Sequence, residues 1–270
     1  MLNPEGHLRR YGMMFTVKAG LSRQGIRTYS TVRYPDTDID VVVRPQRYWR
    51  ELEMGNWESS CISHVRKVAK KGDLLLDIGA FHGAYSLLFS KLAGEGGKIY
   101  AFEPDPDARA VLIDNLRKNR ATNVHVLPSC VADAPGTAIL KSLDWGLSGA
   151  TIMGHLNGGV AKRITVEATS VDAFCAANGV RPSGMKIDVE GAEGLVLQGA
   201  RRVIREFSPW VLLEFHSLFM SEEMKEANWK LATESAKRIT FVNGKDRTYS
   251  PGDEMDELPK SDTFHVLIDY

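Results

Sequence analysis

The sequence predicts a doubly wound α/β fold, in which a mostly parallel sheet carries helices on both faces. Two observations lead to this prediction. The segment LLLDIGA (74–80) is a continuous apolar strand, as expected for a parallel strand that is covered on both sides. Further strand patterns, such as KIYAFEP (98–104), then alternate with segments of helical spacing along most of the chain. Strand and helix alternating this often indicates one sheet between two layers of helices.

The predicted elements follow one another from the end of the N-terminal segment onward. Residues 1 to about 50 mix Arg, Tyr and Gly and contain one convincing strand, at 40–43. Helical spacing begins at Trp57 and ends before Gly72, a residue typical of helix C-termini. From there we expect strand 74–80, helix 85–93, strand 98–104, helix 107–119 and strand 123–128.

Residues 134–169 interrupt this alternation. Their glycines and the alternating pattern ITVEAT predict an inserted β-hairpin with a mobile loop. Ser170 then caps a short helix that ends at Gly179. The alternation resumes with strand 184–189, helix 192–206, strand 210–216, helix 221–236, strand 239–243 and a terminal strand at 263–268. We therefore divide the chain into an N-terminal extension, 1–56, that could cover a bound ligand, and an α/β domain, 57–270.

The composition argues against several classes of protein. A hydrophobic fraction of 43% in 270 residues supports a full core, so a disordered chain is not expected. The 34 basic and 34 acidic residues balance, and no long-range field favours nucleic acid or an anionic membrane. Three widely spaced cysteines without a CxxC motif suit a reducing compartment. With no signal peptide and no apolar run near the ~18 residues of a membrane span, we expect a cytoplasmic protein, with a homo-oligomer left open.

In open α/β sheets ligands bind beyond the carboxyl ends of the strands, so the residues at those ends are candidates for a site. The first strand ends in DIGAFHG, where Gly79 and Gly83 allow a tight turn before the next helix. A dinucleotide fingerprint would need GxGxxG to hold a pyrophosphate. Asp77, in front of the glycines, suits instead a ligand with a positive amino group, although a plain turn with structural glycines is an alternative interpretation.

The next two strand ends each add one group. Glu103, followed by Pro104, is placed to accept hydrogen bonds from both hydroxyls of a ribose. Asp133, which follows Ala132, is placed to take an adenine amino hydrogen, although a single acid is a weak signal. An amine, a ribose and an adenine without a pyrophosphate are the groups of S-adenosylmethionine.

Four segments, DIGAFHGAYS, AFEP, MKIDVEGAEGLVLQGA and VLLEFH, in this order and spacing, resemble the FkbM-like family of methyltransferases. The resemblance covers roughly residues 50–217, and its KIDVEGAE segment is specific to the family. It implies a Rossmann-like class I fold and an S-adenosylmethionine-dependent O-methyltransferase that acts on a hydroxyl of a small molecule or glycan, such as a sugar or a polyketide product. The chain departs from the family at Phe81 and His82, where Asn and an aliphatic residue are common.

The resemblance also suggests which residues contact the cofactor. Carried onto this sequence, they are Glu58, Asp77, Gly79, Ala80, Gly83, Ser86, Glu103, Pro104, Ala132 and Asp133. Glu58 belongs to the segment before the first strand, which could fold over the cofactor and place this carboxylate near the methionine amine. Trp57 beside it is more often an ordinary core residue.

Methyl transfer to an alcohol requires a group that aligns the hydroxyl and removes its proton. Asp188 ends the strand that we place beside the glycine turn, and Lys186, two residues earlier on the same face, is expected to hold it ionised. Glu214 and His216 share one side of the adjacent strand. This set is interpreted as a general-base network or, less favoured, as ligands of a divalent metal.

Two further acids follow Asp188 at the start of a predicted helix. Negative charge is favourable there, so Glu193 is interpreted as a helix-start acid that pairs with Lys186 or a nearby Arg. The role of Glu190 is left open.

Two other functions remain as alternatives. An NAD(P)-linked oxidoreductase is disfavoured by the missing GxGxxG, and a non-catalytic methyltransferase-like binding module is disfavoured by the retained strand-end acids. The acceptor itself is not predicted. Its recognition is expected in segments 1–50, 141–162 and 217–262, where Trp145, His155 and Trp229 could stack on a sugar ring.

Overall fold

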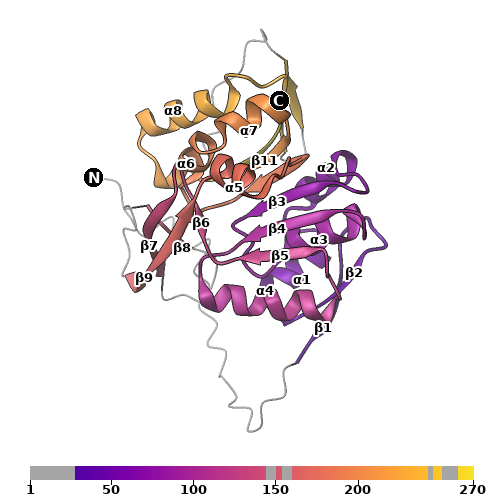
Figure 1. Cartoon of the computed structure of the whole chain (residues 1–270). Helices are drawn as coiled ribbons and strands as arrows, with labels where there is room; N and C mark the ends of the chain where they lie inside the picture. Colours follow the sequence, from indigo (N-terminus) through magenta and orange to yellow (C-terminus); the bar gives the residue numbers. More distant parts are fainter. Residues whose placement is uncertain (1–27, 144–149, 154–159, 243–245, 251–260) are drawn as a thin grey trace, which may run out of the picture.

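A computed structural model describes residues 28–143, 150–153, 160–242, 246–250 and 261–270. Its central element is an eight-stranded sheet of order β13-β12-β14-β11-β10-β3-β4-β5 (Figure 1). The strands, in that order, are Arg247–Tyr249, Arg238–Phe241, Phe264–Asp269, Trp210–Phe215, Gly184–Ile187, Leu74–Ile78, Lys98–Phe102 and Val124–Leu127. From β11 to β5 the strands are parallel, whereas β14, β12 and β13 pair antiparallel. The predicted mostly parallel sheet is confirmed.

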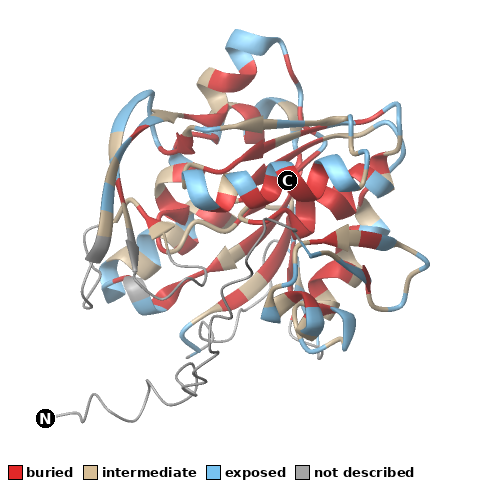
Figure 2. Ribbon diagram, turned by 90° about the horizontal axis from the view of Figure 1, so that it is seen from below, coloured by how far each residue is buried: buried red, intermediate tan, exposed pale blue. Residues whose placement is uncertain are grey.

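Helices cover both faces of this sheet. One layer contains α1 (Arg47–Glu53), α2 (Ser59–Val68), α3 (Ala84–Ala93) and α4 (Pro106–Lys118). The other contains α5 (Val171–Asn178), α6 (Glu193–Gln198), α7 (Arg201–Phe207) and α8 (Glu222–Thr233), and a short 3-10 helix (Ser217–Phe219) follows β11. Successive strand residues point into opposite layers: Leu75 belongs to the first core and Leu76 to the second, and both are fully buried. Figure 2 shows buried residues along the central strands and on the helices that pack against them.

The inserted hairpin forms a separate small sheet. Its strands are β6 (Cys130–Val131), β9 (Val160–Thr169), β7 (Gly136–Leu143) and β8 (Ala150–Thr151), in that spatial order. The long antiparallel pairing of β7 with β9 confirms the predicted hairpin. The predicted mobile loop falls largely on residues 144–149 and 154–159, which lie outside the described part of the chain.

The N-terminal segment contributes to the same core as the main sheet. A hairpin of β1 (Ser30–Arg33) and β2 (Asp40–Val43) precedes α1, and neither β1 nor α1 was predicted. Val43, Trp49 and Leu52 are buried together with residues of α3. The Asn119 side chain bonds both the N–H and the C=O of Val42, which ties β2 to the end of α4. The domain boundary at residue 56 stays a prediction.

The helix predicted over residues 192–206 is two helices, so that prediction was wrong in one respect. α6 ends at Gln198 and α7 begins at Arg201, with Gly199 between them. The Asp172 carboxylate accepts the N–H groups of Arg202 and Val203 and so caps the second helix. A side chain at Gly199 would also lie 2.2 Å from the Ala132 carbonyl oxygen. Close packing and a cap from a distant residue therefore end one helix and start another.

Candidate functional site

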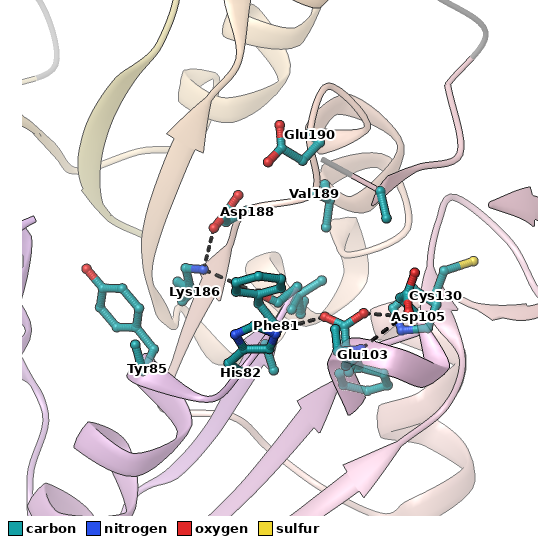
Figure 3. Close-up of a pocket in the computed structure, with 18 of the residues that line it drawn as sticks. Phe81, His82, Tyr85, Glu103, Asp105, Cys130, Lys186, Asp188, Val189 and Glu190 are labelled. Carbon is teal, nitrogen blue, oxygen red and sulfur yellow. Dashed lines mark hydrogen bonds and ion pairs between the residues drawn. The ribbon is translucent and has the colours of Figure 1, made fainter. Parts of the chain in front are cut away.

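The site lies where the order of the sheet reverses. From β3 the chain proceeds outward through β4 and β5, and from β10 it proceeds the other way to β11. The carboxyl ends of β3 and β10 therefore flank the position where doubly wound sheets bind ligands. A cavity of about 470 Å³ opens there (Figure 3). The predicted site residues that line it are Glu58, Gly79, Ala80, Glu103, Pro104, Lys186, Asp188 and Glu214.

Other predicted residues lie off the cavity wall. They are Asp77, Gly83, Ser86, Ala132, Asp133 and His216. Asp77 is fully buried, and its Oδ2 accepts a 2.5 Å hydrogen bond from the Ser86 hydroxyl. A direct contact between Asp77 and a ligand amine stays a prediction. The burial of Asp77 and its bond to Ser86 do not favour such a contact. Asp133 is exposed, and the buried side chains of Cys130 and Val131 line the cavity near that strand end instead.

The glycine turn, which follows β3 along the chain, packs closely against the end of β10. Gly79 has φ +83°, and a Cβ placed on it would lie 1.8 Å from the carbonyl oxygen of Asp188. The Asp188 N–H donates to the Ile78 carbonyl oxygen at 3.0 Å. Glycine is therefore needed for the conformation and for the close approach of the two strand ends. The turn fixes the position of Asp188.

Glu103 presents an ordered carboxylate to the cavity. Its Oε2 accepts the Phe81 N–H at 2.7 Å and its Oε1 accepts the Asp105 N–H at 2.8 Å (Figure 3). Each oxygen has about two lone pairs, so one on each remains for a further donor. Burial raises the pKa of Glu103 to about 7, against the opposing effect of the two N–H groups. This arrangement can accept two neighbouring hydroxyls, as the sequence predicted for a ribose.

The buried Lys186 and the partly exposed Asp188 form an ion pair on the cavity wall. The distance from Lys186 Nζ to Asp188 Oδ2 is 2.7 Å, that of a charge-assisted hydrogen bond (Figure 3). Burial and the nearby Glu214 raise the pKa of Asp188, and Lys186 opposes this rise. The predicted pairing is present, but the net direction is upward, which makes Asp188 a stronger base than an exposed carboxylate.

The structure brings His216 together with Asp188 and Glu214, as predicted, with their candidate ligand atoms within 4.8 Å of one another, and adds Glu193 as a further partner. The His216 Nδ1 lies 2.8 Å from Oε1 of the fully buried Glu193. Its Nε2 lies 3.8 Å from Asp188 Oδ1 and 3.5 Å from Glu214 Oε1. Burial acts to lower the pKa of His216, but the bond to Glu193 and the surrounding carboxylates outweigh it and raise the pKa to about 10. A raised pKa favours an imidazole that orients the carboxylates around it, whereas a role of His216 as a base stays a prediction. The expected pairing of Glu193 with Lys186 or an Arg was wrong, because its partner is His216.

Strained backbone on the cavity wall was not predicted from the sequence. Of the non-glycine residues at positive φ, Glu58, Phe81 and Glu190 all line the cavity. Strained backbone of this kind collects at functional sites. Tyr48, Trp57 and Tyr85 add aromatic surface to the wall. Trp229, by contrast, packs in the core against Phe241 and does not line the cavity. Trp145 and His155 lie outside the described residues.

Comparison with known protein families identifies the family of this chain. The profile of the methyltransferase FkbM domain matches residues 77–249, which include the glycine turn, Glu103, Asp188 and Glu214. The chain belongs to the FkbM methyltransferase family. None of the curated proteins compared matches the chain.

Solved structures similar to this FkbM protein are class I methyltransferases. FkbM from Methylobacillus flagellatus has 16% sequence identity and a TM-score of 0.46, over 84% of this chain and 56% of that one. Fibrillarin from Aeropyrum pernix, solved with S-adenosylmethionine, has 15% identity and a TM-score of 0.45, over 78% and 73%. An rRNA methylase from Streptococcus thermophilus has 10% identity and a TM-score of 0.46, over 77% and 93%. Likeness at this level says nothing about the acceptor.

The cofactor of this family is S-adenosylmethionine, as predicted, and the cavity fits it. Glu103 offers two acceptor positions for the ribose hydroxyls. Ala108, Val111 and Val131 supply an apolar surface suited to an adenine. The volume is that of an ordinary small-molecule site. The family assignment also argues against the NAD(P)-linked oxidoreductase.

The Glu103→Gln variant should bind S-adenosylmethionine at least about tenfold more weakly, because hydrogen bonds to a charged acceptor are lost. With a pKa of about 7, Glu103 becomes ionised as the pH rises from about 6 to about 8, and the wild-type affinity should rise over that range. The variant should lose this part of the pH dependence. Isothermal titration at several pH values measures both effects, with the exposed Glu206→Gln as the control. Equal affinity of the variant and the wild type would remove Glu103 from the ribose site.

Proposed function

We propose that this FkbM methyltransferase transfers a methyl group to a hydroxyl of a small molecule or glycan in the cytoplasm. S-adenosylmethionine supplies that methyl group as a sulfonium. One observation carries the proposal: the Asp188 carboxylate lies on the cavity wall at the end of β10, beside the glycine turn, and is oriented by Lys186 at 2.7 Å. Asp188 aligns the acceptor hydroxyl and takes its proton as the oxygen–carbon bond forms.

The charge of the cavity favours a small acceptor over nucleic acid. Among the described residues that line the cavity, seven have an acidic side chain, and Lys186 is the only lysine or arginine. The acids are Glu58, Glu103, Asp105, Asp107, Asp188, Glu190 and Glu214. A phosphate backbone is normally held by Lys and Arg, so this wall would repel it. Carboxylates beside aromatic rings can instead accept hydrogen bonds from hydroxyls while a sugar or polyketide ring packs on Tyr48, Trp57 or Tyr85.

Methyl transfer from labelled S-adenosylmethionine to a panel of sugars, glycans and polyketide alcohols tests the proposal. We expect label on oxygen in at least one acceptor class, located by mass spectrometry and NMR, and none in RNA. A matched acceptor in which the methylated hydroxyl is replaced by hydrogen should take no label. Label on nitrogen or RNA would contradict the proposal. Tight cofactor binding without any transfer across the panel would favour a non-catalytic binding module.

A further inference from the structure

A group of ligand-type side chains lies at the edge of the cavity, and its cysteine and its histidine, Cys61 and His265, have no part in the proposed chemistry. Glu58 precedes α2, Cys61 lies in its first turn, and His265 comes from β14. Their candidate ligand atoms all lie within 4.8 Å of one another. Glu214 on β11 is the cross-strand partner of His265 and adds a fourth side chain. The four residues, Glu58, Cys61, Glu214 and His265, are here called the α2–β14 cluster.

The distances within the α2–β14 cluster are long for a charge-assisted hydrogen bond from His265. Its Nε2 is buried and lies 3.3 Å from Glu214 Oε2 and 3.7 Å from Glu58 Oε2, and no well-aligned hydrogen bond joins it to either oxygen. An N–H that served a carboxylate would approach it to about 2.7–2.9 Å. One N–H can also point at only one of the surrounding atoms, whereas oxygens of two carboxylates lie near this nitrogen, and the Cys61 sulfur lies within 4.8 Å of a ring nitrogen of His265.

The same distances suit a shared metal ion. Around a tetrahedral Zn²⁺ with bonds of about 2.0–2.1 Å to nitrogen and oxygen, neighbouring ligand atoms are about 3.3–3.4 Å apart, and about 3.5 Å when one is sulfur. The His265–Glu214 and His265–Glu58 separations of 3.3 and 3.7 Å lie close to this range. These two separations therefore match those of neighbouring ligands around one ion.

The chemistry of the α2–β14 cluster points to a borderline or soft cation. A thiolate, an imidazole and carboxylates select Zn²⁺ or a similar transition metal over Mg²⁺ or Ca²⁺, which prefer oxygen alone. The Tyr85 hydroxyl donates to Glu58 Oε2 at 2.6 Å, an outer contact of the kind that orients metal ligands. Cys130 and Cys175 are also buried and free, but neither belongs to such a group among the described residues.

We propose that Glu58, Cys61, Glu214 and His265 bind one transition-metal ion of the zinc type. The ion ties the start of α2 to β11 and β14, and so it fixes two acids, Glu58 and Glu214, that also line the cavity. The two oxygens of Glu214 face different neighbours. Oε2 lies toward His265 and the proposed ion, and Oε1 lies toward His216, so this carboxylate stands between the metal site and the Asp188 side of the wall.

Cobalt substitution tests this proposal without any knowledge of the acceptor. The full chain is stripped with a chelator and titrated with Co²⁺, then with Zn²⁺. We expect one ion per chain, a thiolate-to-cobalt charge-transfer absorption, and its loss when Zn²⁺ displaces Co²⁺. Cys61→Ser should abolish the charge-transfer band, while Cys130→Ser and Cys175→Ser keep it. His265→Ala should weaken Co²⁺ binding by more than about 100-fold, since outer contacts alone contribute 10–100-fold.

Two outcomes would overturn the proposal. One is a wild-type protein that binds no Co²⁺ above background, and the other is a charge-transfer band that survives in Cys61→Ser. Circular dichroism checks the fold of each variant, and Glu58→Gln, of unchanged shape, provides a second ligand test if Cys61→Ser unfolds. Titration with S-adenosylmethionine on the same samples separates this proposal from the function above: cofactor binding without metal would remove only the metal site.

Discussion

Gly79→Ala should destabilise the protein by about 3 kcal/mol or more and disrupt the cavity. Two effects add. The positive φ of +83° costs an alanine roughly 1–2 kcal/mol, and the new Cβ would lie 1.8 Å from the Asp188 carbonyl oxygen, so the ends of β3 and β10 must move apart. Because that movement displaces Asp188, binding of S-adenosylmethionine and turnover should fall with stability. Urea unfolding measures the first effect and calorimetric titration the second.

Gly72→Ala is the matched control for this experiment. Gly72 has nearly the same φ, +85°, but no atom lies within 4 Å of the Cβ that the substitution adds. It should therefore report the backbone cost alone, about 1–2 kcal/mol, with cofactor binding intact. If both variants lowered the free energy of unfolding by the same amount, the close approach of the glycine turn to β10 would not contribute to the cost of the Gly79→Ala substitution.

The parts of the fold that follow from local chemistry were predictable. The strand LLLDI is apolar except for the buried Asp77 because both of its faces are covered, and the hairpin of β7 and β9 follows from alternation and glycine. The pairing of Lys186 with Asp188 follows from the two-residue period of a strand. In each case the signal lies within a few neighbouring residues.

The rest depends on contacts between distant segments. The break between α6 and α7 is capped by Asp172, which no pattern within residues 192–206 contains. His265 becomes a candidate ligand only when the register places it opposite Glu214. The raised pKa of His216 similarly depends on the burial of Glu193 against it, and that burial is decided by packing. A lone histidine on a strand carries none of this information.

The Asp188→Asn variant should lower turnover by ~10²–10⁴-fold, the usual contribution of a positioned base. The amide keeps the shape of the side chain but cannot take the hydroxyl proton, whereas Glu103 and the apolar wall are unchanged, so affinity for S-adenosylmethionine should change little. Single-turnover kinetics with saturating cofactor and acceptor isolates this effect from binding.

Asp269→Asn controls for the loss of an ion pair as such. Asp269 accepts a 2.7 Å hydrogen bond from Arg238 at the far end of β14 and does not line the cavity, so this variant should retain its turnover. Asp188→Asn also leaves the buried Lys186 with one fewer partner, so the melting temperatures of both variants are compared. Turnover is then measured well below the lower of the two melting temperatures. A folded Asp188→Asn protein with turnover near that of the wild type would show that the carboxylate only balances the charge of Lys186. The hydroxyl proton would then have to be taken by another acid on the cavity wall. The nearest such acid along the chain is Glu190.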